Sequence, residues 1–166
     1  MPVSSLRDPP VRNVRARFAD GFGQRALLTV DTEEEFNWRG EFSKTGYGLD
    51  HVTRLAKFQQ FCENLEVVPV YLVDWPIATS AEAEIGVQLH PWVNPPHDEE
   101  VSTLNSFAGN LPYELERAKL LRLRDQIAAA FGVSPMIYRA GRYGTGPRTA
   151  EILREAGIAI DTSVRS

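Results

Sequence analysis

The run Ile85-Gly-Val-Gln-Leu89, followed directly by His90, carries the pattern that decides the fold. It is a short apolar segment of strand length that ends in an ionisable residue. The pattern recurs at residues 26–30 before Asp31, 67–73 before Asp74, 136–138 before Arg139 and 158–160 before Asp161. Near-continuous apolar strands of this kind predict a parallel sheet that is buried on both faces.

The segments between these runs predict helices. Apolar residues follow helical spacing from Asp50, a candidate N-cap, to Cys62. Residues 113–131 form the longest helical pattern, and Gly132 ends it. A further helix is expected over residues 147–156. Alternating strands and helices predict an α/β fold with mainly parallel strands.

Length and composition indicate one ordinary globular domain. The chain has 166 residues, and we expect a loose N-terminal segment at 1–24 and a single domain at 25–166. The net charge of −4 argues against a nucleic-acid partner. No apolar stretch approaches the ~18 residues of a membrane span, and no signal peptide is evident. We therefore expect a cytoplasmic protein without a membrane partner.

Parallel strands would bring the five ionisable residues to one rim. That rim, at the carboxyl ends of the strands, is where open α/β sheets and (β/α) barrels place their sites. A single strand often leaves the core through a polar residue, but five such endings favour a site. Four aromatic residues follow the same strand ends and suit either the apolar face of a sugar or simple packing. They are Trp38, Trp75, Trp92 and Tyr143.

The rim residues suggest metal chemistry. Asp31 and Glu33 are two residues apart, so both carboxylates can point the same way from a strand. One could hold a divalent metal while the other acts as a base, with His90 as the nitrogen ligand. The acidic run 33–35 could also be a solvated turn. Arg139 would orient a catalytic aspartate, and the glycine-rich loop after it lacks the spacing of a nucleotide-binding loop.

Three blocks of the sequence resemble the polysaccharide deacetylase (NodB-homology) superfamily, above all its WalW-like and other atypical members. They are Leu28-Thr-Val-Asp-Thr-Glu-Glu-Glu-Phe36, Glu84-Ile-Gly-Val-Gln-Leu-His-Pro-Trp92 and Tyr138-Arg-Ala-Gly-Arg-Tyr-Gly144. The resemblance extends over nearly all of residues 25–164. It implies a distorted (β/α) barrel, a divalent metal, usually zinc, and hydrolysis of N-acetyl groups or related carbon–nitrogen bonds.

The resemblance also implies roles for individual residues. Asp31 would be the general base, held by Arg139, and Glu33 and His90 would bind the metal. Tyr143 would lie in the wall of the substrate groove.

The sequence departs from the family pattern in two places. The second metal-binding histidine of the family is replaced by Asn94, a poor zinc ligand. His97 could replace it only if the loop through Pro95 and Pro96 folds back. The last block of the family, which carries the general-acid histidine, is absent. We therefore expect an incomplete barrel, truncated at the C-terminus, whose open sheet edges favour a homo-oligomer.

These observations predict a metal-dependent hydrolase that removes N-acetyl groups from an amino sugar or polysaccharide. The expected substrate contacts are Trp38, Trp75, Trp92, Tyr143, Asp74 and Asp161. Two alternatives stay open: a degenerate deacetylase fold that binds carbohydrate without catalysis, and a hydrolase of small amides or ureides.

Overall fold

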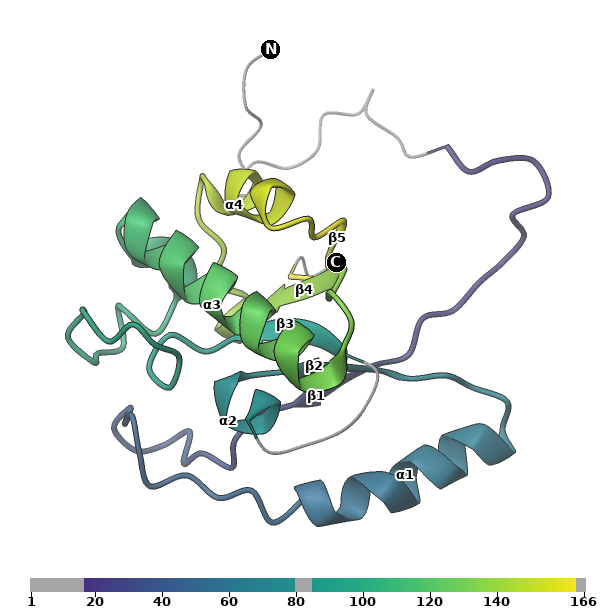
Figure 1. The fold of residues 1–166 in the computed structure, drawn as a ribbon, viewed down its shortest axis with the longest axis horizontal. Helices are drawn as coiled ribbons and strands as arrows, with labels where there is room; N and C mark the ends of the chain where they lie inside the picture. Colours follow the sequence, from purple (N-terminus) through teal and green to yellow (C-terminus); the bar gives the residue numbers. More distant parts are fainter. Residues whose placement is uncertain (1–16, 80–84, 164–166) are drawn as a thin grey trace.

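A computed structural model describes residues 17–79 and 85–163 of the chain (Figure 1). This part is a mixed α/β structure built on a parallel sheet. Its strands are β1 (Thr29–Thr32), β2 (Val70–Val73), β3 (Ile85–Leu89), β4 (Ile137–Ala140) and β5 (Ile160–Asp161). Its α-helices are α1 (Val52–Asn64), α2 (Trp75–Ala78), α3 (Tyr113–Phe131) and α4 (Thr149–Glu155), with 3₁₀ turns at Ala108–Asn110 and Gly141–Tyr143.

All neighbouring strands pair in parallel, in the order β1-β2-β3-β4-β5. The predicted α/β fold with parallel strands is therefore confirmed. Spatial order equals sequence order, so each connection moves the chain on by one strand. Within the described residues the sheet is open, with β1 and β5 as its outer strands.

The two faces of the sheet differ in chemistry. One face carries alternate apolar residues, such as Val73, Val87 and Tyr138, which pack with side chains of α2, α3 and α4 in the main core. Figure 1 shows α3 lying along the sheet over β3. The other face carries Asp31 and Arg139, and the Asp31 side chain is 37% exposed. Burial on both faces is thus found for β2 and β3 but not for β1.

The helix boundaries follow local sequence signals. Helix α3 has the predicted bounds, and Gly132 closes it in the left-handed conformation with φ 71°. The N-cap position of helix α1 is His51 rather than the predicted Asp50, and no side chain forms a cap hydrogen bond there; Thr53 Oγ1 donates to the Asp50 carbonyl at 2.8 Å. Helix α2 occupies the short connection after β2, whose remaining residues 80–84 lie outside the described part.

Residues 17–24, the described part of the predicted N-terminal segment, are exposed throughout. Residues 1–16 of that segment lie outside the described part. None of the helices in the described residues combines the length and the apolar character that a bilayer crossing requires.

Candidate active site

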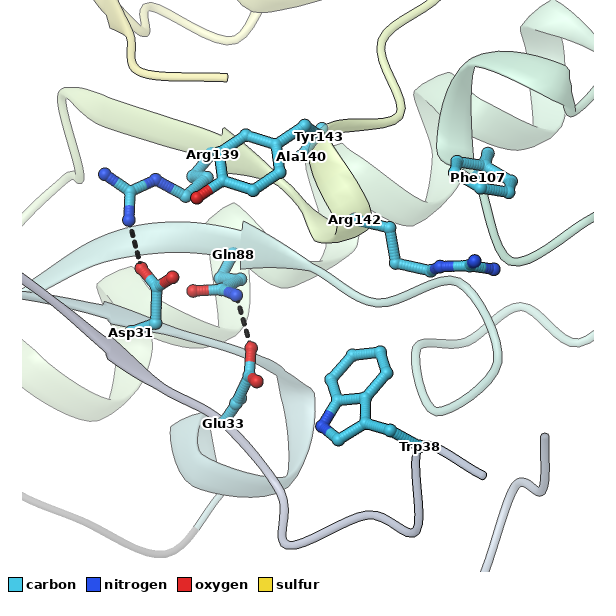
Figure 2. Close-up of a pocket in the computed structure, with 9 residues that line it drawn as sticks. All are labelled: Asp31, Glu33, Trp38, Gln88, Phe107, Arg139, Ala140, Arg142 and Tyr143. Carbon is cyan, nitrogen blue, oxygen red and sulfur yellow. Dashed lines mark hydrogen bonds and ion pairs between the residues drawn. The ribbon is translucent and has the colours of Figure 1, made fainter. Parts of the chain in front are cut away.

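A pocket of about 630 Å³ opens at the carboxyl edge of the sheet (Figure 2). Strands β1, β3 and β4 and the loops that follow them supply its walls. Its lining residues are Asp31, Glu33, Trp38, Gln88, Phe107, Arg139, Ala140, Arg142 and Tyr143. The pocket therefore brings together five of the residues expected at the site: Asp31, Glu33, Trp38, Arg139 and Tyr143. Gln88, Phe107 and Arg142 were not expected there.

Arg139 of β4 forms hydrogen bonds with residues on both sides of it in the sheet, in β1 and directly after β5. Its Nη1 donates to the Asp31 carboxylate, and its Nη2 donates to Thr29 Oγ1 at 2.9 Å. Its Nε donates to Thr162 Oγ1 at 3.2 Å. Every nitrogen of the guanidinium is thus engaged, and the Arg139 side chain is only 15% exposed. This arrangement fixes the direction of the Asp31 carboxylate.

His90 lies beneath the pocket floor, fully buried, at the end of β3. Its Nδ1 lies 2.8 Å from Glu34 Oε2, and its Nε2 lies 3.2 Å from Glu33 Oε2. Trp92 stacks on the imidazole with ring centroids 4.4 Å apart and donates Nε1 to the other Glu34 oxygen at 2.8 Å. Gly141 makes room for the ring, because a Cβ at this position would lie 2.5 Å from His90 Cδ2. The imidazole therefore has one fixed orientation.

Asp74 completes a buried acidic cluster. Its Oδ2 accepts the Glu34 backbone N–H at 2.9 Å, and its Oδ1 accepts the N–H of Ile77 and so caps α2. Glu34, Asp74 and His90 offer ligand atoms that lie within 4.8 Å of one another, so this group could hold a metal ion. Glu34 was missed by sequence reasoning, since nothing in the run 33–35 marks its middle residue as the buried one.

The close contacts within this cluster shift the pKa values of His90, Glu34 and Asp74. Burial opposes the charged form of His90, but the hydrogen bonds that its ring N–H groups donate to Glu33 and Glu34 prevail and raise its pKa to about 10. Burial likewise opposes the charged form of Glu34, but its bonds with His90, Asp74 and Trp92 lower its pKa to about 2. Burial and the neighbouring Glu34 raise the pKa of Asp74 well above its usual range. Without a bound ion, an imidazolium thus balances the carboxylates.

The Glu34–Asp74–His90 group could hold a metal ion, and His90 also has a ring nitrogen on the pocket side. Both oxygens of Glu34 and both of Asp74 already accept hydrogen bonds. His90 Nε2 instead points at Glu33 and Gln88, two residues that line the pocket. An imidazole nitrogen with carboxylate oxygens is a donor set that zinc accepts. A carboxylate on the other ring nitrogen, here Glu34, is the usual support of a metal-binding histidine.

The side-chain oxygen of Gln88, which lines the pocket, is a buried acceptor without a hydrogen-bond partner among the described residues. Its Nε2 donates to Glu33 Oε2, whereas its buried Oε1 has no hydrogen-bond partner within residues 17–79 and 85–163. Figure 2 shows this oxygen turned toward the Asp31 side of the pocket. A bound water or a substrate N–H would satisfy it.

Two further metal candidates lie apart from the His90 cluster. Asn94 donates Nδ2 to the backbone carbonyls of Pro95 and Lys119, so its side chain is directed away from His90. His97 is exposed, and partial burial together with nearby lysines lowers its pKa. The Asn94 backbone N–H donates to the His90 carbonyl at 3.2 Å, but within residues 17–79 and 85–163 neither the Asn94 nor the His97 side chain bonds the His90 imidazole.

The remaining expected substrate contacts lie outside the pocket wall. Trp92 is 2% exposed and Asp74 is fully buried, so neither presents a surface to a ligand in this structure. Trp75 begins α2 and packs against the core, with the Arg122 guanidinium over its ring. Asp161 Oδ1 accepts from the backbone N–H of Ser163. Alternation along β5 puts Asp161 on the core side, beside Tyr138.

A buried lysine fixes the loop that follows His90. Lys119 of α3 donates Nζ to the carbonyls of Pro91, Asn94 and Pro96 at 2.9, 2.6 and 2.5 Å. It also pairs with Glu99 at 2.8 Å. The sequence pattern of α3 gave no sign of this contact, because a lysine on a helix is usually solvated.

No family model and no curated protein matches the chain. The fold and the pocket define its class: an α/β protein with a parallel sheet, whose carboxyl edge carries an acidic pocket over a buried histidine.

Proposed function

We propose that the chain is a metal-dependent hydrolase that removes N-acetyl groups from an amino sugar or polysaccharide. We also propose that its sheet belongs to a distorted (β/α) barrel. One observation carries the functional proposal: the Nε2 of His90 is directed at Glu33 in the same pocket that holds the Asp31–Arg139 pair. Metal-dependent amide hydrolysis needs a metal-binding group and a carboxylate base side by side. The sequence resemblance supports the same reaction class.

Glu33 and His90 would hold the metal, and zinc is the ion that their donor atoms favour. When bound, the metal would act as a Lewis acid on the amide carbonyl. Glu34 and Trp92 would keep the imidazole in the orientation that leaves Nε2 free for the ion.

Asp31 would accept the proton of the attacking water. Its carboxylate is held by Arg139, which is itself held by Thr29 and Thr162, so the base is fixed before substrate binds. Gln88 Oε1 lies free to accept a hydrogen bond from that water or from the amide N–H.

Trp38 would bind the sugar. Its indole is 53% exposed and lies edge-on to His90, with ring centroids 6.2 Å apart. Asp31, Glu33 and Trp38 also line a second hollow of about 600 Å³ that adjoins the first. Two hollows that share the acidic residues suit a chain of sugars better than a single small amide.

Metal analysis of the purified protein tests the proposal. We expect a near-stoichiometric divalent ion in the wild type, and its loss in His90→Ala and in Glu33→Ala. His97→Ala, at an exposed histidine, is the matched control and should keep the ion. A metal content that neither variant changes would contradict the proposal. Release of acetate from acetylated amino sugars, absent in Asp31→Asn, is the second test.

A second candidate function is carbohydrate binding without catalysis. It is favoured by Asn94, which occupies the family's second histidine position and is directed at the Lys119 carbonyl instead of His90. A metal-free wild type that binds chitin oligomers, and loses that binding in Trp38→Ala, would support this candidate over the hydrolase.

A further inference from the structure

Arg142 is a cation in the pocket that no carboxylate of the described part of the chain pairs with. The other cation there, Arg139, is paired with Asp31. No Asp or Glu side chain of the described residues forms an ion pair with Arg142, whose described side-chain contacts are a serine and two aromatic rings. An arginine that lines a pocket without a counter-ion is a site for an anionic group of a ligand.

The guanidinium of Arg142 is held in place. It lies over the Phe107 ring at 4.0 Å and over the Phe42 ring at 5.2 Å. Its Nη1 donates to Oγ of the buried Ser106 at 2.5 Å. These contacts leave other N–H donors of the planar group without an acceptor among residues 17–79 and 85–163. Because the group is already ordered, it would lose little conformational entropy on binding a ligand.

The backbone at this position is unusual. Arg142 and Tyr143 have φ of 55° and 56°, in the left-handed region that residues with a Cβ rarely adopt. Such conformations persist where the surrounding structure enforces them, and they concentrate at functional sites. Here both residues line the pocket.

We propose that Arg142 binds a carboxylate of the substrate, so that the pocket selects an N-acetylated amino sugar that carries a carboxylate. This inference rests on the proposed function, since it takes the acetylated amino sugar as the substrate. Figure 2 shows the Arg142 guanidinium beside Phe107, on the opposite side of the pocket from Asp31. The carboxylate would therefore sit away from the N-acetyl group. A carboxylate is favoured over a phosphate, because Asp31 and Glu33 line the same pocket and repel a dianion more strongly.

Calorimetric titration of the EDTA-treated protein tests the inference. N-acetylglucosaminuronic acid and N-acetylglucosamine form a matched pair of probes, because they differ only at C6, which is a carboxylate in the first and a hydroxymethyl group in the second and lies across the ring from the C2 N-acetyl group. We expect the acidic sugar to bind the wild type roughly tenfold to a hundredfold more tightly, the range that a hydrogen-bonded charge pair provides. Arg142→Gln should abolish this difference, and Arg142→Lys should restore only part of it.

Arg148→Gln is the control, because Arg148 also stacks on an aromatic ring, Tyr113, but does not line the pocket. It should bind both sugars like the wild type. Equal binding of the two sugars by the wild type, or an unchanged preference in Arg142→Gln, would overturn the inference. Tighter binding of N-acetylglucosamine 6-phosphate than of N-acetylglucosaminuronic acid would overturn the assignment to a carboxylate.

The outcomes separate this inference from the proposed function. Preference for the acidic sugar that depends on Arg142, in a protein that never binds metal, would support the inference and refute the hydrolase. Deacetylation of both sugars with equal kcat/KM, unaffected by Arg142→Gln, would support the hydrolase and refute the inference.

Discussion

Arg139 of β4 bonds the carboxylate of Asp31 on β1, although β2 and β3 lie between these strands in the sheet. Neighbouring strands are ~4.8 Å apart, so β1 and β4 would be roughly 14 Å apart in a flat sheet. That separation is too large for the two side chains to meet if they stood upright on a flat surface. The two side chains therefore lean toward each other across the face of the sheet. This contact brings residues from β1 and β4 into one pocket.

Replacing Arg139 should weaken this link. In Arg139→Lys a single ammonium cannot bond Asp31, Thr29 and Thr162 together, so we expect the free energy of unfolding to fall by about 1–3 kcal/mol. Urea unfolding followed by tryptophan fluorescence measures it. Arg154→Lys, at an exposed position of α4, is the control and should change stability by less than about 0.5 kcal/mol. Equal stability of the two variants would mean that the cross-sheet link contributes nothing.

A metal ion could bind His90 at Nε2 beside Glu33 or at the buried group with Glu34 and Asp74, and the metal affinities of three variants distinguish these two sites. If the ion binds at Nε2, Glu33→Gln removes a ligand, whereas Glu34→Gln only loosens the imidazole and should weaken affinity about 10- to 100-fold. Asp74→Asn should then have a small effect. Competition with a zinc-selective chelator measures all three variants. The reverse order, with Glu34→Gln and Asp74→Asn most affected and Glu33→Gln spared, would place the ion in the buried group instead.

The pKa shifts predict how the stability of the EDTA-treated protein depends on pH. The pKa of Glu34 is lowered from 4.5 to about 2, so its contribution is present above pH 4.5 and is lost as the pH falls toward 2. The pKa of His90 is raised from 6.5 to about 10, so its contribution is present below pH 6.5 and is lost as the pH rises toward 10. Asp74, whose pKa is raised, opposes the effect of Glu34 at acid pH.

Urea unfolding at successive pH values tests both the acid limb and the alkaline limb of the stability profile, that is, the loss of stability below pH 4.5 and the loss above pH 6.5. His90→Gln should lack the loss of stability between pH 6.5 and 10, and Glu34→Gln should show a weaker loss below pH 4.5. His51→Gln, at a histidine outside the cluster, should retain the alkaline limb of the wild type. An alkaline limb that persists unchanged in His90→Gln would exclude His90 as its source.

Two glycines, Gly141 directly after β4 and Gly86 within β3, test whether the imidazole needs the space beside it. A Cβ at Gly141 would lie 2.5 Å from both His90 Cδ2 and the Leu89 carbonyl oxygen. A Cβ at Gly86 would lie 2.5 Å from Leu72 Cδ2, away from His90. We expect both alanine variants to lose about 1–3 kcal/mol of stability through overpacking. Only Gly141→Ala should also weaken metal binding, and a similar loss in Gly86→Ala would show that the effect is not local to His90.

Much of the fold could be predicted from local sequence signals. The bounds of β3 and α3 agree with the apolar runs, because strand length, helical spacing and the Gly132 stop act over a few residues. The placement of Asp31 and Arg139 in one site also followed, because parallel strands bring their carboxyl ends to one edge. The positions of Trp75 and Trp92 could not be predicted in this way, because an aromatic residue after a strand can turn either toward the core or toward solvent.

The sequence by itself determined the order of strands and helices, their parallel arrangement and the edge where the acidic residues gather. Each of these depends on spacing along the chain. Only the tertiary structure decided that Glu34, rather than Glu33 or Glu35, is buried against His90, and that Arg142 lies in the pocket with no counter-ion from the residues that the structure describes. Three adjacent glutamates have the same local propensity, and the contacts of Glu34 with His90, Trp92 and Asp74 distinguish it from its neighbours. Burial and charge pairing depend on residues brought together from distant parts of the chain.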